Sequence, residues 1–317
     1  MRRRDFMKTA ALTAAGGVVS AARAHEGGKG AKVCLHLFSK PLQWLGVDRL
    51  VEVVAEAGYG GIDLTVRPGG HVKPEKAGTE LPRVVEAARR QGLKIRMMTT
   101  SLTDPEDPAA ERLLKTAAQC GIRIYRMGYL RYAGGRPMGE ELERLRRVLA
   151  AFEQLNRSCG ISGGYQNHRA WEERLFGGVL WDLHAALKGL DPQWIGSQYD
   201  VHHAVAETGG SWVAGMRLIA PHITSTCLKD YIWPAADKQR HQGVFAGEGL
   251  VPWKRYYELV KELRIGGPAS VHCEWELFTK AEQALTEPER CAIAVRKLKR
   301  DSEFFTAQYA NCGLTVE

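Results

Sequence analysis

Strand-like and helix-like segments alternate along most of the chain, and this alternation limits the fold more than any other feature of the sequence. Each short apolar run is followed by a longer segment with helical spacing, which is typical of an α/β protein with a parallel sheet. Eight such units in about 280 residues match the count and size of a (β/α)8 TIM barrel. We expect strands over residues 31–38, 62–66, 93–99, 122–127, 161–165, 194–199, 223–228 and 269–273.

Helices are expected over residues 47–57, 80–91, 103–120, 139–159, 179–188, 211–220, 253–263 and 286–307. The third should begin at Thr103-Asp104-Pro105, because Asp and Pro favour the first positions of a helix. A doubly wound open sheet is the alternative fold. That fold needs a glycine-rich phosphate turn after the first strand, and Ser39-Lys40-Pro41-Leu42 offers none.

The first 24 residues are expected to be a targeting segment. Arg3-Arg4-Asp5-Phe6-Met7-Lys8 resembles the twin-arginine export motif, and Ala22-Arg23-Ala24 supplies a cleavage site after a stretch of small residues. A basic amphipathic tail is the alternative. The sequence therefore predicts a twin-arginine signal peptide over residues 1–24, a barrel domain over residues 25–317, and a periplasmic or otherwise exported mature protein.

The charge of the chain gives little support for a nucleic-acid partner. The formal net charge is +8, but half of this excess lies in the first 24 residues. The remainder is mildly basic and has no basic run interleaved with aromatic residues, as nucleic-acid binding would need. No apolar stretch after the signal is long enough to span a membrane. We therefore expect a small-molecule ligand, while a homo-oligomer stays open.

Polar residues follow five of the expected strands at the point where each strand ends. In a parallel barrel these ends meet at one mouth, where active sites lie. Carboxylates, imidazoles and an amide gathered there are ligands for a divalent ion such as Mn, Co, Zn or Mg. The five groups are Asp63 to His71, Gln166 to His168, Asp200 to His203, Lys229 with Asp230, and Glu274 with Glu276.

These strand ends resemble the xylose-isomerase-like TIM barrel superfamily, whose exported bacterial members are usually labelled sugar phosphate isomerase/epimerase. The resemblance rests on the order of four short motifs: Asp200-x-x-His203, Leu228-Lys229-Asp230, the segment from Gly247 to Trp253, and His272-Cys273-Glu274. It implies a metal-assisted enzyme acting on a carbohydrate. Endonucleases of the same superfamily need a richer set of metal ligands and a basic groove, and the chain shows neither.

The resemblance also implies a metal site made of Gln166, Asp200, Cys227 and Glu274. Two of these positions depart from the epimerase pattern, which has Glu where this chain has Gln166 and His where it has Cys227. An amide oxygen can still bind a metal, and a Cys thiolate would favour a softer ion such as Zn. A degenerate barrel that binds a sugar without catalysis is therefore an alternative.

The expected chemistry is removal of the proton next to a carbonyl, through an enediolate that the metal stabilises. Glu274 is the firm candidate for the base, and His168, His203 or Lys229 would supply the second acid-base group. One firm carboxylate with several imidazoles also suits β-elimination on a 3-keto-glycoside, so a lyase is the second possibility. Because the protein is expected outside the cytoplasm, we interpret the substrate as an unphosphorylated sugar or keto-sugar.

Further residues near the expected mouth are candidates for substrate contacts. Arg67 and His71 lie in a Pro-Gly-Gly loop that could cover the mouth, and Asn167 adjoins Gln166. An aromatic ring can stack on the face of a sugar. The candidates for such stacking are Trp233, Trp275 and Tyr129.

Overall fold

The computed structural model describes residues 32–169, 174–236 and 240–317. Its centre is a closed barrel with strand order β11-β2-β3-β4-β5-β6-β7-β8, and all neighbouring strands are parallel. The expected (β/α)8 fold is confirmed. The expected signal peptide over residues 1–24 lies outside the described residues. The barrel strands are β2 (Leu35–Phe38), β3 (Gly61–Thr65), β4 (Lys94–Thr99), β5 (Ile124–Arg126), β6 (Ser162–Gln166), β7 (Ile195–Asp200), β8 (Ile223–Leu228) and β11 (Ala269–Val271).

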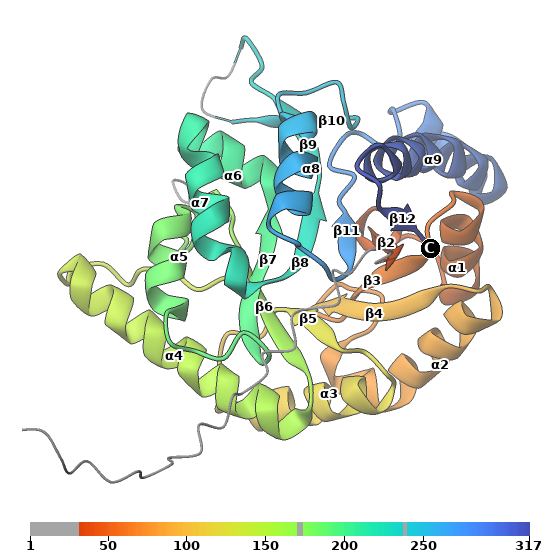
Figure 1. The fold of residues 1–317 in the computed structure, drawn as a ribbon. Coiled ribbons are helices and arrows are strands. Elements are labelled where there is room, and N and C mark those ends of the chain that lie inside the picture. Colours follow the sequence, from red (N-terminus) through yellow and green to blue (C-terminus); the bar gives the residue numbers. More distant parts are fainter. Residues whose placement is uncertain (1–31, 170–173, 237–239) are drawn as a thin grey trace, which may run out of the picture.

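Helices surround the barrel, as Figure 1 shows. Their apolar faces pack on the strands and on one another, which buries one extensive hydrophobic core. No helix in the described part of the chain is both long enough and apolar enough to span a bilayer. The α-helices are α1 (Val47–Glu56), α2 (Ala77–Arg90), α3 (Pro108–Gln119), α4 (Met138–Cys159), α5 (Leu180–Leu187), α6 (Val201–Thr208), α7 (Trp212–Ile219), α8 (Trp253–Glu262) and α9 (Glu287–Asn311).

Two helix starts differ from the sequence-based expectation. Helix α3 begins at Pro108, because the side chain of Asp107, rather than that of Asp104, accepts a hydrogen bond from a helical backbone N–H. Helix α6 follows strand β7 without a loop, because the Asp200 carboxylate caps it by accepting from the backbone N–H of His203 at 3.1 Å. The expected helix over residues 211–220 is α7, so the unit after β7 contains two short helices instead of one.

The segment after β8 carries an additional antiparallel pair, β9 (Asp230–Ile232) and β10 (Gln242–Val244). The buried carboxylate of Asp230 fixes the chain that follows. It accepts hydrogen bonds from the backbone N–H groups of Tyr231, Gly247, Gly249 and Val251, and from the indole N–H of Trp253. These five bonds hold the β8–α8 connection against the end of the barrel.

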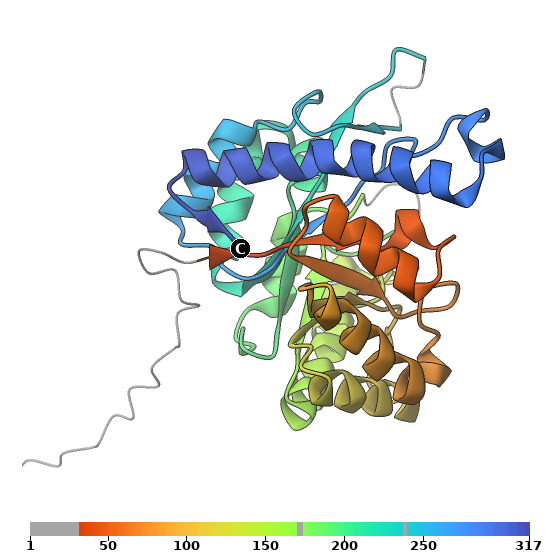
Figure 2. The same cartoon turned by 90° about the vertical axis from the view of Figure 1, so that its right-hand side faces the viewer.

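The barrel closes between its first and last strands. Strand β11 pairs with β2 in the register Ala269↔Leu35, Ser270↔His36 and Val271↔Leu37. Next to this seam, β1 (Lys32–Val33) pairs in parallel with β12 (Thr315–Val316). Helix α9 runs alongside α1, which follows the first barrel strand (Figure 2). The Glu317 carboxylate lies 3.0 Å from Lys94 Nζ and 2.9 Å from Arg96 Nη1.

Candidate active site

A cavity of about 130 Å³ opens among side chains that lie at or after the carboxyl ends of β2, β3, β5, β6 and β11. This is the face of a TIM barrel on which active sites lie. The strand-end residues of the sequence analysis therefore do come together in space. The cavity is lined by Phe38, Lys40, Arg67, Arg126, Tyr129, Gln166, His168, His272 and Glu274.

Gln166, at the end of β6, is held in one orientation by its partners. Its Oε1 accepts from Arg126 Nη1 at 2.7 Å and from the Tyr129 hydroxyl at 2.6 Å. A guanidinium can only donate, so the amide oxygen must face Arg126 and the amide nitrogen must face the other way. That nitrogen donates to Asp200 Oδ2 at 2.7 Å and lies 3.4 Å from Cys227 Sγ.

Lys229 lies at the centre of the predicted ligands. Its ammonium is 3.2 Å from Asp200 Oδ2, 3.1 Å from Glu274 Oε1 and 2.9 Å from His203 Nε2. Only 1% of the Lys229 side chain is exposed, and the Asp200 side chain is fully buried. Burial would lower the pKa of Lys229, but Asp200 and then Glu274 outweigh burial and raise this pKa above its usual value. Lys229 is therefore a permanent cation.

Glu274 joins this ion-pair network to the cavity. Its side chain remains 36% exposed and carries the single carboxylate among the described residues that line the cavity. Burial would raise the pKa of Glu274, but the nearby positive groups, led by Lys229, hold it below its usual value. Glu274 is therefore ionised at neutral pH and accessible from the cavity.

The predicted catalytic residues divide into two groups. Glu274 and His168 line the cavity, whereas Lys229 and His203 lie behind them. The rings of His168 and His203 are 4.0 Å apart between centroids. Burial, followed by the charge of Lys229, lowers the pKa of His168 to about 2 and holds the pKa of His203 well below its usual value. Both imidazoles are therefore neutral.

Three histidines form a second cluster beside this network. Ligand nitrogens of His202, His203 and His241 all lie within 4.8 Å of one another, so these residues could hold a metal ion. His202 Nε2 and His241 Nδ1 are 2.9 Å apart. A tetrahedral ion with bonds of 2.0–2.1 Å would separate its ligand nitrogens by roughly 3.3 Å, so nitrogens that lie up to 4.8 Å apart would have to move closer together. The sequence analysis had assigned no role to His202 or His241.

The four metal ligands that the resemblance implies do not fit a divalent ion as they are arranged here, because their lone pairs are not directed at a common point. The Gln166 oxygen is already bonded to Arg126 and Tyr129, so the amide presents N–H groups to Asp200. Burial raises the pKa of Cys227 well above its usual value, so a metal ion would have to displace the proton of a buried thiol. The ammonium of Lys229 already lies between the two carboxylates. The four-ligand site stays a prediction.

The predicted substrate contacts have different environments. Arg67 lines the cavity, whereas Asn167 and Trp233 are not among the residues that line it. Asn167 is fully buried and clamps the end of β7, since its Nδ2 donates to the Asp200 carbonyl and its Oδ1 accepts from the Asp200 N–H. Trp233 is 38% exposed and packs edge-on against the ring of His241.

The other two aromatic candidates differ in the same way. Tyr129 lines the cavity and donates from its hydroxyl to Gln166. Trp275 is buried, and its indole N–H donates to Asp301 Oδ2 at 2.8 Å, so it belongs to the packing behind the mouth.

Sequence reasoning missed four residues that line the cavity: Phe38, Lys40, Arg126 and His272. Arg126 was detectable, because a lone Arg at the end of an apolar barrel strand points to the mouth. His272 lies on the face of its strand opposite Cys273, and this alternation alone favours a packed polar side chain. That face does point into the barrel, but the end of strand β11 is already at the mouth, where the His272 ring stacks on Phe38 with centroids 4.1 Å apart.

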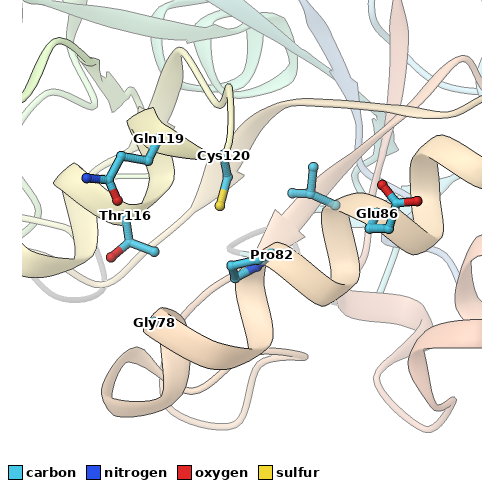
Figure 3. A pocket seen from close by; sticks show the side chains of 7 residues that line it. Gly78, Pro82, Glu86, Thr116, Gln119 and Cys120 are labelled. Atoms are coloured by element: carbon cyan, nitrogen blue, oxygen red, sulfur yellow. The ribbon is translucent and has the colours of Figure 1, made fainter.

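A larger hollow of about 380 Å³ lies on the outer surface between α2 and α3. Figure 3 shows Gly78, Pro82 and Glu86 on one side of it, and Gln119 and Cys120 on the other. Among the described residues that line this hollow, Glu86 is the only charged one, and its carboxylate is bonded to a neighbouring arginine of α2. The strand-end cavity, although smaller, gathers the titratable groups and is the candidate active site.

Comparisons with known proteins agree with this fold. A family model described as "Xylose isomerase-like TIM barrel" matches residues 51–294, and no curated protein matches the chain. The structure of D-psicose 3-epimerase with D-tagatose from Clostridium cellulolyticum H10 is similar, with a TM-score of 0.61 at 12% identity, covering 86% of this chain and 99% of that one.

Two other similar structures are 3-keto-D-glucoside 4-epimerase YcjR from E. coli and the probable 3-DHS dehydratase AsbF from Bacillus anthracis. The first has a TM-score of 0.60 at 11% identity and covers 84% of this chain and 99% of its own. The second has a TM-score of 0.61 at 17% identity and covers 87% of this chain and 98% of its own. At these identities the likeness shows a shared fold.

Proposed function

Because this chain belongs to the xylose isomerase-like TIM barrel family, we propose that it is a sugar-modifying enzyme of the isomerase and epimerase type. The reaction begins with removal of a proton next to a carbonyl of an unphosphorylated sugar or keto-sugar. The observation that carries the proposal is the position of Glu274. Its carboxylate opens onto the cavity, is held ionised by buried Lys229, and shares the cavity with donors from Arg126 and Tyr129.

In this mechanism the Glu274 carboxylate takes the proton from the carbon next to the substrate carbonyl. The electron pair of the broken C–H bond moves to the carbonyl oxygen and forms an enediolate. The Arg126 guanidinium supplies positive charge for that oxygen, and its hydrogen bond to Gln166 fixes its position before substrate arrives. Return of the proton to the other face gives an epimer, and return to the neighbouring carbon gives an isomer.

Lys229 acts in this mechanism through Glu274, because it does not line the cavity. It keeps the carboxylate ionised and in one position. His168 is neutral and lines the cavity, so it is the candidate for a hydrogen bond to the substrate oxygen.

Elimination from a 3-keto-glycoside is the second candidate reaction. An epimerase that uses two carboxylates needs a second one at the substrate, and Glu274 is the single carboxylate among the described residues that line the cavity. Elimination needs one base together with an acid for the leaving group. Glu274 can return the proton it has taken to the leaving oxygen, and the neutral imidazole of His168 can hydrogen-bond to that oxygen. Structures named for 3-keto-D-glucoside 4-epimerase and for a probable dehydratase share this fold, which supports keto-sugars as the first compounds to assay.

Two further parts of the proposal come from the sequence. Metal assistance at Gln166, Asp200, Cys227 and Glu274 is implied by the resemblance, and no step above depends on it. Export through the twin-arginine pathway is proposed from residues 1–24 and favours carbohydrates that occur outside the cytoplasm. Fractionation of cells that express the full chain, compared with Arg3→Lys, Arg4→Lys, tests this location.

The reaction is tested by proton exchange in D2O. The purified protein is incubated with unphosphorylated ketoses and 3-keto-glycosides, and deuterium at the carbon next to the carbonyl is followed by NMR. We expect exchange with the wild type and a loss of at least about 100-fold in Glu274→Gln, because general-base catalysis contributes that much. Glu56→Gln removes an exposed carboxylate at the end of α1, outside the cavity lining, and should leave the rate unchanged. Binding without exchange across the panel would favour the non-catalytic sugar-binding barrel.

A further inference from the structure

The candidate active site carries more positive charge than a neutral sugar requires. Lys40, Arg67 and Arg126 line the cavity, and Glu274, the single carboxylate in the described part of its lining, is paired with buried Lys229. Within residues 32–169, 174–236 and 240–317, the side chains of Lys40 and Arg67 have no carboxylate partner and no hydrogen-bond partner. The buried Nε of Arg126 also has no partner among these residues.

The two guanidinium groups are held near the same aromatic ring. The central carbon of Arg67 lies 5.6 Å from the centroid of Phe38, and that of Arg126 lies 5.8 Å from it. His272 stacks on this ring with an interplanar angle of 18°. Two like charges in a partly desolvated cavity repel each other, and an anion between them would relieve that repulsion.

The loop that carries Arg67 is fixed in advance of any ligand. His71 ties it to the neighbouring loop, since its Nδ1 lies 3.1 Å from Ser39 Oγ and its Nε2 lies 3.1 Å from the Leu42 carbonyl. The turn is tight, because a Cβ on Gly70 would lie 2.7 Å from the Thr65 carbonyl. His71 is therefore a positioning residue for Arg67. Its predicted part in substrate binding is to hold the loop that carries Arg67.

We propose that Arg67, together with Lys40 at the rim and Arg126 inside, binds a carboxylate of the substrate, so that the substrate is a sugar acid. The inference rests on the proposed function for the carbohydrate part of the ligand. A guanidinium matches a carboxylate with two parallel hydrogen bonds. Phosphate sites normally add backbone N–H donors. In this loop the N–H groups of Gly70 and His71 are already bonded to Arg67 O and Thr65 Oγ1.

Calorimetric titration of the wild-type protein at low ionic strength tests the inference. The probes are D-glucuronate, D-galacturonate, methyl α-D-glucopyranoside as a neutral sugar, and glucose 6-phosphate. We expect a uronate to bind at least about 10-fold more tightly than the neutral sugar, because one hydrogen bond to a charged group contributes enough binding free energy for that factor. Arg67→Gln should abolish the difference, and Arg67→Lys should keep part of it. Arg83→Gln, on the exposed side of α2, is the matched control and should change nothing.

Four results would overturn the proposal. These are no uronate binding at millimolar concentration, equal affinity for uronate and neutral sugar, unchanged uronate affinity in Arg67→Gln, or tighter binding of glucose 6-phosphate than of either uronate. The measurement needs no turnover, so it separates this proposal from the proposed reaction. Uronate binding that survives in Glu274→Gln, without proton exchange in the wild type, would support the anion site and refute the reaction.

Discussion

Replacing Lys229 by Met tests whether the buried ammonium is the group that holds the site together. Met keeps most of the length of the side chain and removes its charge. The Asp200 carboxylate then loses a cation 3.2 Å away and keeps two donors, the Gln166 amide at 2.7 Å and the His203 N–H at 3.1 Å. Both members of this ion pair are at most 1% exposed, so water cannot replace the lost partner.

The expected cost follows from this burial. Removing one partner of a buried ion pair lowers the free energy of unfolding by about 3–5 kcal/mol. In a domain of this size 1 kcal/mol shifts Tm by about 2–4 °C, so Tm should fall by roughly 6–20 °C. Adding Asp200→Asn removes the stranded charge. The double variant should therefore recover at least half of the unfolding free energy that Lys229→Met loses. If the two replacements acted independently, their costs would add and no recovery would occur.

Thermal unfolding and urea unfolding of the wild type, Lys229→Met, Asp200→Asn and the double variant provide the measurement. Lys254→Met, on the exposed side of α8, is the control and should stay within about 0.5 kcal/mol of the wild type. The reasoning fails if Lys229→Met costs less than about 1 kcal/mol, or if the double variant is less stable than either single variant.

Two other predictions concern stability in acid and metal binding. Burial lowers the pKa of His36 from 6.5 to about 4. Between these two pH values the unfolded chain binds a proton at this residue and the folded chain does not, so the free energy of unfolding decreases as the pH falls from 6.5 to 4. Relative to His36→Gln, the wild type should lose about 2 kcal/mol between pH 7.5 and 5 in urea titrations, and parallel pH profiles would contradict this. The double replacement Gln166→Glu, Cys227→His adds a carboxylate and an imidazole, and should bind Co²⁺ at least about 10-fold more tightly than the wild type by dialysis and elemental analysis. The histidine cluster is common to both proteins, so equal affinities would mean that these two positions do not limit the metal site.

The sequence was sufficient to predict the barrel and the face of the site. Its apolar runs have the length of buried strands, and polar residues such as Gln166 and Glu274 mark their carboxyl ends. It was not sufficient at the start of α6, where Asp200 has two roles. Its backbone ends strand β7 while its carboxylate caps the next helix, so no loop residues separate the two elements.

The contacts inside the site were less predictable than its location. Alternation along β8 places Lys229 on the same side as Cys227, but it does not say that the ammonium lies between carboxylates from two other strands. The orientation of Gln166 depends on Arg126 and Tyr129, which belong to a different unit of the barrel. His241 directly precedes β10, on the connection from β9, and contacts His202 of α6. No spacing in the sequence indicates that contact.

The seam between β2 and β11 has a consequence for aggregation. A closed barrel exposes no strand edge, but opening this one seam would create two unpaired edges at once, each able to pair with another molecule. The β1–β12 pair and the ion pairs of Glu317 with Lys94 and Arg96 lie beside the seam and oppose its opening. The last residues of the chain therefore protect the protein against self-association, although they are far from the mouth where the ligand would bind.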